Sequence, residues 1–472
     1  MSGTRVHLRE WQSLGPEDPQ AGLRGVHLAG NDARALARRL TESGIVEIVD
    51  LNDGIRVRAL AHVGRIHVGG LVITIEPKIG SGQLLELLRY TYGLRDLQLF
   101  DITGFATTGQ LLQDLICAQL LAEVSELVER GLAKRYVGRS DLLLSPRGRL
   151  DINDLARRSP LRSARITCRY HQRSTDHLLN QVALAGVRLA SNVAQDPQLS
   201  RSLARLAKRL GEEILGVRLG SSVLEQARRH LDRLSAAYAP ALRLVDLLYA
   251  CSAVSLDGEA ATELPGFLFD MNRFFQALME RFLRENLHTF DVKAEHGLAE
   301  MMRYMPGLNP RRRRPPRPRP DFLVSREGKV AALLDAKYRD LWERDLPRDM
   351  LYQLAIYALS QPKAATAAIL FPTIIADTTA AVIEIRDPVR AGALGYVALR
   401  PVALGELLEA VRVDSDPDRR IRLAKKLAFG TGQELVRSEW PGELIGGNTS
   451  KPSPTWPLGP ATQRSANWPP QV

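Results

Sequence analysis

Residues 317–342 read RPRPDFLVSREGKVAALLDAKYRDLW, and this stretch decides the fold of the second half of the chain. Residues 321–325 and the almost wholly apolar residues 330–337 predict two strands, joined as a hairpin by the turn at 326–329. Two polar residues, Asp335 and Lys337, interrupt the end of the second strand. Because side chains alternate along a strand, residues two apart lie on one face, so we expect both of these on the same side of a sheet.

If the hairpin also brings Asp321 to that face, two carboxylates and one ammonium group converge at one end of the sheet. Paired carboxylates are suited to holding Mg²⁺, and a lysine beside them would orient a nucleophile or steady developing negative charge on a phosphodiester. The alternative is a surface strand end with one salt bridge, because Asp-x-Lys alone is a very weak pattern. The apolar strand favours the functional interpretation, because an Asp and a Lys are costly to bury without a partner or a metal.

The predicted helix upstream of the hairpin, LFDMNRFFQALMERFLRENL, carries two polar residues that could support the site. Gln276 and Glu280 are four residues apart, so they share a flank of this helix and could offer one more polar group to a metal. The alternative for Glu280 is an ion pair with Arg284 on a solvated face of the helix.

The predicted helix downstream of the hairpin, RDMLYQLAIYALSQP, places Gln353 and Tyr357 one turn apart on the same face. These two side chains could contact the DNA backbone or orient active-site groups. The alternative is that Tyr357 is mostly core and Gln353 is its neighbour.

Directly before Asp321, the run NPRRRRPPRPRP at residues 309–320 holds six arginines and five prolines. Such a run cannot form a helix and is expected to be extended and exposed. We predict that it lies along DNA phosphates beside the active site, since arginines contact backbone oxygens without reading sequence. A merely solvated basic loop is the alternative. The arginines assigned to DNA are Arg311, Arg312, Arg313, Arg314, Arg317 and Arg319.

The 472-residue chain has 64 Lys and Arg against 53 Asp and Glu, a net charge of +11 that favours a polyanionic partner such as nucleic acid. Three widely spaced cysteines fit neither a zinc pattern nor a disulfide framework, which favours a reducing compartment. The sequence shows no signal core and no apolar stretch long enough to span a bilayer, so we expect a cytoplasmic protein with no membrane contact. A G-x-x-x-x-G-K-[ST] phosphate loop is also absent.

Strand, helix and breaker patterns divide the chain into units. Alternating residues from 44 to 76 predict strands and hairpins, and helical periodicity dominates the middle of the chain. The Arg-rich stretch 134–149 is expected to be an exposed loop or hairpin. The predicted units are a β-rich N-terminal unit at 1–100, a mainly helical region at 101–260 that docks a partner, an α/β domain at 261–412 and a disordered tail at 431–472.

Several sequence blocks, in order, resemble the McrC family, the nuclease subunit of the McrBC restriction system, within the PD-(D/E)xK nuclease superfamily. The pairing of FLFDMNR with LLDAKYR is the most specific of these matches. The blocks are PKIG with LLRYTYGL, GRLDINDLARR, DHLLNQVALAGVRLA, FLFDMNRFFQALMERFLR, PDFLV with LLDAKYR, and YQLAIYAL.

The resemblance implies an α/β (α+β overall) chain, with a β-rich and helical N-terminal half before a PD-(D/E)xK endonuclease domain whose central mixed sheet is flanked by helices. It implies that Asp321 and Asp335 bind one or two Mg²⁺ ions and that Lys337 is the catalytic lysine. It also matches Gln353 and Tyr357 to a Gln-x-x-x-Tyr element of related nucleases. One departure is Gln276, which stands where such proteins commonly carry a Glu.

The family's restriction system is specific for 5-methylcytosine, and the resemblance further implies a DNA endonuclease subunit that acts on modified DNA with a hexameric McrB-like AAA+ GTPase, without showing which modification is recognised. The N-terminal half would dock into the pore or face of that ring and stimulate its GTPase, with the Arg-rich stretch 134–149 as a candidate contact. A regulatory or scaffold subunit with a weakened nuclease site is the alternative that Gln276 keeps open. An RNA- or DNA-binding protein without enzymatic activity ranks below both, because aromatic content is only 6%.

Overall fold

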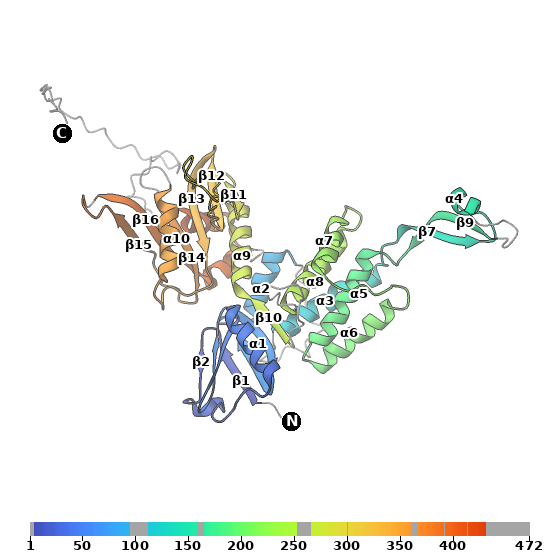
Figure 1. The fold of residues 1–472 in the computed structure, drawn as a ribbon, viewed down its shortest axis with the longest axis horizontal. Coiled ribbons are helices and arrows are strands. Elements are labelled where there is room, and N and C mark those ends of the chain that lie inside the picture. Colours follow the sequence, from blue (N-terminus) through green and yellow to red (C-terminus); the bar gives the residue numbers. More distant parts are fainter. Residues whose placement is uncertain are drawn as a thin grey trace, which may run out of the picture.

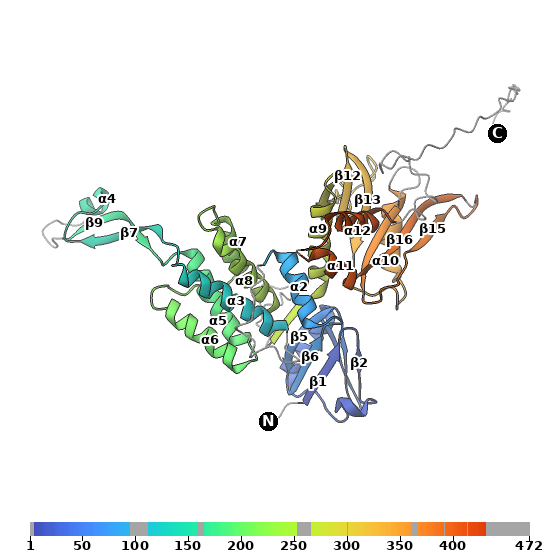
Figure 2. The same ribbon diagram turned by 180° about the vertical axis from the view of Figure 1, so that it is seen from behind.

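The computed structural model describes residues 4–94, 112–157, 165–252, 266–299, 301–360, 366–390, 392–412 and 414–430. It is a mixed α/β structure with several separate sheets, as the sequence predicts (Figures 1 and 2). Across these residues, none of the helices combines the length and apolar character needed to cross a membrane. The predicted disordered tail at 431–472 lies outside the described residues.

The N-terminal unit is built from two small sheets and two helices. Strands β1, β6 and β5 lie side by side in one sheet, and β2, β4 and β3 form the other. Helix α1 packs against β3 and β5 over a shared apolar core, which buries the alternating residues of the strands. The elements are β1 (Thr4–Arg9), β2 (Ser13–Leu14), α1 (Asn31–Glu42), β3 (Val46–Leu51), β4 (Gly54–Ala59), β5 (His62–Val68), β6 (Leu71–Glu76) and α2 (Ser81–Tyr92).

The middle of the chain is a helical region with one long projection. Helix α5 packs against α3, α6, α7 and α8 around a continuous apolar core. The bounds are α3 (Leu112–Glu129), α5 (Leu178–Val193), α6 (Pro197–Leu210), α7 (Ser221–Arg229) and α8 (Ala239–Ser252).

Between α3 and α5 the chain leaves the helical region as an arm, whose described residues are 135–157 and 165–174 and which points away from the body in both views (Figures 1 and 2). Its three-stranded sheet has the order β7-β9-β8, with β7 and β9 antiparallel along their full length. The stretch 134–149, expected to be an exposed loop or hairpin, forms one strand of this arm and the turn after it. The elements are β7 (Arg135–Leu143), β8 (Arg149–Leu150), α4 (Ile152–Arg157) and β9 (Ile166–Ser174).

The C-terminal unit centres on a six-stranded mixed sheet of order β11-β12-β13-β14-β16-β15. Strands β13, β14 and β16 run parallel, and the other pairings are antiparallel. The bounds are β10 (Gly266–Asp270), α9 (Met271–Asn286), β11 (Asp291–Ala294), β12 (Phe322–Arg326), β13 (Lys329–Ala336), α10 (Arg348–Leu359), β14 (Thr366–Thr373), β15 (Ala381–Arg386), β16 (Ala393–Ala403), α11 (Leu404–Val411) and α12 (Pro417–Phe429).

Helices cover both faces of this sheet because its central strands are apolar on both sides. Phe322 and Leu334 face a core shared with α9 and α12, whereas Leu323 and Leu333 face a second core shared with α10. The alternation of a strand thus separates neighbouring residues into two cores. The hairpin predicted at 321–337 therefore lies at the centre of the unit.

Two elements extend across the predicted domain boundaries. Strand β10, inside the predicted domain 261–412, pairs antiparallel with β5 and so completes the sheet of the N-terminal unit. Gly64 permits this pairing, because its φ is +137° and a Cβ there would overlap the carbonyl oxygen of Phe267. Helix α12 begins after residue 412 and packs on α9, β13 and β16.

The predicted helix from Leu268 was wrong at its start. Residues 266–270 form β10, and α9 begins only at Met271. The carboxylate of Asp270 accepts hydrogen bonds from the N–H groups of Asn272 and Arg273, which caps the helix there.

Candidate active site

The end of β13 carries the two polar residues that interrupt its apolar run. Asp335 is 2% exposed, and the backbone N–H of Lys337 donates to the carbonyl oxygen of Leu370 on the neighbouring strand β14. The ammonium group of Lys337 lies 3.0 Å from the Oδ2 atom of Asp335. The two side chains therefore share one face, as their spacing predicts.

Asp321 immediately precedes β12, which pairs with β13, and this pairing brings its carboxylate to the same place. Its Oδ2 atom accepts from the N–H of Ala336 at 2.8 Å and lies 3.5 Å from Nζ of Lys337. Its own N–H donates to Oδ1 of Asp335 at 3.3 Å. Two carboxylates and one ammonium group thus converge at one end of the sheet.

Burial and mutual repulsion shape the charges of this trio. Burial raises the pKa of Asp321 to about 6, and the neighbouring Asp335 adds to that rise. Burial alone would lower the pKa of Lys337, but the two carboxylates outweigh it, so its pKa is raised. The lysine is therefore protonated at neutral pH, and with both carboxylates ionised the trio would carry one net negative charge.

Of the two candidate supporting residues on α9, the structure brings one to the carboxylates. The Nε2 atom of Gln276 donates to Oδ1 of Asp321 at 3.3 Å. Glu280 instead forms an ion pair with Arg284 on the same helix, which is the alternative that its spacing left open. The side-chain amide of Gln276 therefore contacts the site from the helix side.

The two candidate residues on α10 contact each other. Nε2 of Gln353 donates to the hydroxyl oxygen of Tyr357 at 2.9 Å. Tyr357 is 2% exposed and packs in the core that lies between α10 and the sheet. Burial raises the pKa of Tyr357, with further contributions from Asp335 and Asp321, so this ring lies within electrostatic reach of the carboxylates. Tyr357 is therefore a core residue whose hydroxyl contacts Gln353.

The Arg-Pro run reaches the site from outside the sheet. Its six arginines are exposed, whereas Pro320, directly before Asp321, is buried. The side chain of Asn309 bonds both the N–H and the carbonyl of Arg313, which closes a turn in the run. The run is thus an exposed basic segment that ends at the first carboxylate.

The donor set of the site fits magnesium better than a closed transition-metal site. Among the residues that the structure describes, no cluster of three or more His, Cys, Asp or Glu side chains is arranged to hold a metal. Mg²⁺ commonly uses one or two carboxylates, keeps several waters and binds substrate phosphate oxygens. Asp321 and Asp335 supply such a pair, and the pKa rise of Asp321 shows that the pair would gain from a nearby cation.

A joint beside the site, which the sequence did not predict, ties the segment after β13 to the N-terminal unit. The hydroxyl of Tyr338, next to Lys337, donates to Oε2 of Glu10 at 2.9 Å, and Nζ of Lys78 lies 3.7 Å from Oδ2 of Asp340. Burial raises the pKa of Glu10 to about 7. The only signal in the sequence was that Lys78 falls in the PKIG block, to which no role was assigned.

Comparisons with known proteins agree with this architecture. The model of a family described as McrBC 5-methylcytosine restriction system component matches residues 57–372. No curated protein matches the chain. A chain of a refined half-complex from a tetradecameric assembly of Thermococcus gammatolerans McrB AAA+ hexamers with bound McrC is 21% identical, with 89% of this chain and 99% of that chain covered and a TM-score of 0.55. This likeness shows a shared fold.

The cryo-EM structure of the Thermococcus gammatolerans McrBC complex contains a second similar chain. It is 20% identical over 60% of this chain and 88% of that chain, with a TM-score of 0.43.

Proposed function

Because the chain belongs to the family of McrBC 5-methylcytosine restriction system components, we propose that it is the Mg²⁺-dependent DNA endonuclease subunit of such a system, with a PD-(D/E)xK nuclease domain. The observation that carries the proposal is the convergence of Asp321, Asp335 and Lys337 at one end of a mixed sheet. Cytoplasmic DNA bearing modified bases is the substrate that we assign to it.

Within this proposal, Asp321 and Asp335 would hold Mg²⁺, which when bound would polarise the phosphodiester and lower the pKa of a water molecule. Gln276 fixes one oxygen of Asp321, and the N–H of Ala336 fixes the other, so the carboxylate is oriented before any cation arrives. Lys337 stays protonated and can donate to a phosphate oxygen or orient the nucleophile as negative charge develops.

The Arg-Pro run, residues 309–320, would bind the DNA backbone beside the site. Its exposed arginines can pair with phosphates, and its continuity with Asp321 would place a bound backbone at the carboxylates. Because phosphate contacts carry no sequence information, this run adds affinity without choosing a sequence.

The arm would dock the AAA+ partner, which we take to be a McrB-like GTPase hexamer. Large apolar side chains are exposed toward its far end, namely Leu142, Leu144, Leu150 and Ile152. Exposed apolar groups gathered on a projection are typical of a protein interface. The similar solved structure is described as McrB AAA+ hexamers with bound McrC, which supports the choice of partner.

The arm is mainly basic, with eight arginines against three aspartates in its described residues 135–157 and 165–174. A hollow of about 680 Å³ is lined by Arg139, Arg147 and Arg149, among others. A second hollow of about 590 Å³ on the same arm is lined by Asp141 and Asp151 with other polar residues. A mainly basic surface with some acidic groups can complement a protein partner whose docking face is mainly acidic.

The test is cleavage of methylated and unmethylated plasmid by this chain, alone and with its AAA+ partner, in Mg²⁺ and GTP. We expect cutting that needs the partner, GTP and methylation and that is lost in Asp335→Asn. Asp291→Asn, the same change at an exposed position of the same sheet, is the matched control and should cut normally. Cutting that persists in Asp335→Asn would refute the assigned site.

A regulatory subunit with a weakened nuclease site is the second candidate, and the observation behind it is Gln276. An amide at this position supplies a neutral contact to Asp321 where a carboxylate would add a third charged ligand. If no DNA is cut but the GTPase rate of the partner rises when the chain is added, the regulatory function replaces the nuclease function.

A further inference from the structure

The direction of the arm must be set at its base. The strands β7 and β9 hold each other in register through their own hydrogen bonds, but those bonds do not fix the arm relative to the body. The chain leaves the helical region at Ala133 and returns to it at Thr175. A β-ribbon attached only through two unrestrained connections would change its angle relative to the helical region. Contacts at Ala133 and Thr175 therefore decide whether the arm keeps one orientation.

A single buried side chain binds both ends of the arm. Asn180, on α5 and 0% exposed, donates from Nδ2 to the carbonyl oxygen of Ala133 at 3.1 Å and to that of Thr175 at 2.7 Å. Its Oδ1 atom accepts from the hydroxyl of Tyr238 at 2.6 Å, and that hydroxyl accepts from the N–H of Ala133 at 2.9 Å. Nε2 of His177 also lies 2.9 Å from the carbonyl oxygen of Ala133. We call these three side chains, His177, Asn180 and Tyr238, the base clamp.

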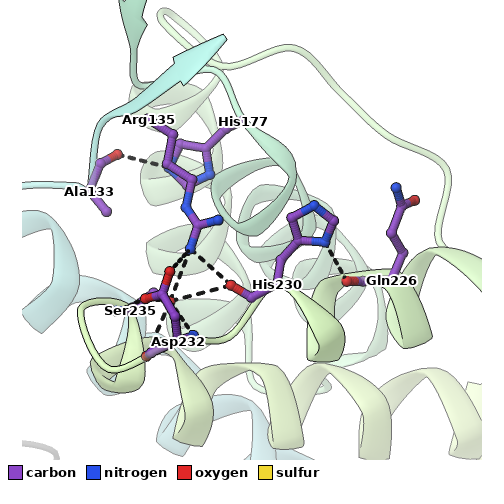
Figure 3. Close-up of polar contacts among 7 residues, drawn as sticks. All are labelled: Ala133, Arg135, His177, Gln226, His230, Asp232 and Ser235. Atoms are coloured by element: carbon purple, nitrogen blue, oxygen red, sulfur yellow. Dashed lines mark hydrogen bonds and ion pairs between the residues drawn. The ribbon is translucent and has the colours of Figure 1, made fainter.

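Further contacts hold each strand of the arm where it meets the body. On the outgoing strand, Arg135 donates to Oδ2 of Asp232, to the hydroxyl of Ser235 and to the carbonyl of His230 (Figure 3). On the returning strand, Oδ1 of Asp176 accepts from the N–H of Leu215 at 3.0 Å. The arm is therefore tied to α5, to the turn after α7 and to the loop after α6.

We propose that the base clamp fixes the arm in one direction, so that its residues are positioning residues for the partner that docks on the arm. The inference rests on the proposed docking function and assigns a role to the block DHLLN, residues 176–180, which the nuclease function leaves unused. An arm of fixed orientation holds its docking surface in the orientation that the partner binds. A released arm docks only during the fraction of time in which it points correctly.

The first measurement tests the clamp in the full chain without a partner. Nitroxide labels on Ser140→Cys in the arm and Gln198→Cys on α6 report the arm-to-body distance by double electron–electron resonance, since the three native cysteines are buried. We expect one narrow distance distribution in the doubly labelled parent and a clearly broader one when Tyr238→Phe or Asn180→Ala is added. A distribution as narrow as that of the parent in both folded variants would overturn the clamp.

The second measurement tests what the clamp does for docking. The GTPase rate of the partner ring is titrated with the parent chain, with Tyr238→Phe, and with Tyr352→Phe, which removes a hydroxyl from a residue of α10, outside the arm, that is 62% exposed. If the released arm points correctly about a tenth of the time, the half-stimulating concentration rises about tenfold in Tyr238→Phe. The value for Tyr352→Phe should stay within about twofold of the parent, because this exposed hydroxyl lies outside both the arm and the base clamp.

The two measurements separate the possible failures. Broadened distances with unchanged stimulation would overturn the positioning role, because docking would then not depend on the direction of the arm. A parent chain that neither binds nor stimulates the ring would refute the docking function. The distance distributions would in that case still decide whether the base clamp holds the arm.

Discussion

We expect the Glu10→Gln variant to gain stability relative to the wild type as the pH rises from 5 to 8. The quantity compared is the difference between their free energies of unfolding. Glu10 is 4% exposed, lies in the joint between the N-terminal unit and Tyr338, and its Oε1 atom is buried without a hydrogen-bond partner. Burial disfavours its ionised form, which the bond from Tyr338 and the charge of Lys78 only partly offset. The glutamine keeps the shape and an acceptor for the hydroxyl of Tyr338 but cannot ionise.

The size of the effect follows from the pKa of Glu10, which is raised from 4.5 to about 7. At about 1.36 kcal/mol per pH unit, this rise is worth about 3 kcal/mol. A raised pKa means that the folded state binds the proton more tightly than the unfolded state. The stabilisation by that proton is therefore complete below pH 4.5 and is lost as the pH rises through about 7.

The assay is urea unfolding of wild type and Glu10→Gln at several pH values between 4.5 and 8. The difference between their unfolding free energies should change by about 3 kcal/mol in favour of the variant, while other titrating groups cancel. Glu17→Gln, at an exposed position of the same unit, should show a difference that stays constant within about 0.5 kcal/mol. A pH-independent difference for Glu10→Gln would mean that Glu10 is ionised in the folded protein, and our reasoning about the joint would be wrong.

Three further predictions concern the Arg-Pro run, the proposed metal site and the core. Replacing Arg311–Arg314 by Gln should weaken the dependence of DNA affinity on salt. In a plot of log affinity against log salt concentration, the slope should fall by about 0.9 for each phosphate that the run no longer neutralises. An unchanged slope in a filter-binding titration would mean that the run does not contact DNA. Gln276→Glu should add a third carboxylate beside Asp321 and tighten Mg²⁺ binding by at least about tenfold. Isothermal titration calorimetry measures this affinity, and an unchanged value would show that this side chain does not reach the metal. Arg400→Met should lower the free energy of unfolding, measured by urea unfolding, by about 2 kcal/mol. The buried guanidinium donates to the carbonyl oxygen of Ala428 near the end of α12, and the variant would leave that carbonyl without this donor.

The hairpin and the convergence of its polar residues were predictable because local rules govern them. Because side chains alternate along a strand, Asp335 and Lys337 lie on the same face of the sheet. The short turn between β12 and β13 then brings Asp321 next to the end of β13. The position of Glu280 was open in the sequence, because one helical spacing allows both a metal contact and the ion pair with Arg284 that forms. The catalytic and metal-binding roles of these residues stay predictions.

Contacts between distant segments were beyond the reach of sequence patterns. Nothing in the neighbourhood of Glu10 indicates that it would meet Tyr338, because the two lie far apart in the chain and belong to different units. In the same way, GFLFD at residues 266–270 resembles the start of the following helix, and only its pairing with β5 makes it a strand. Tertiary pairing overrides local pattern at such places.

The pairing of β10 with β5 also bears on how the protein can be divided for study. A fragment that begins at residue 261 would carry β10 without β5, and the side chains of Phe267, Leu268 and Phe269, each at most 2% exposed in the intact chain, would lose their cover. An apolar strand with an open hydrogen-bonding edge is prone to pair with other molecules. The isolated fragment should therefore aggregate, whereas co-expression with residues 1–252 as a separate chain, which supplies both β5 and the helices packed on β10, should return it to solution.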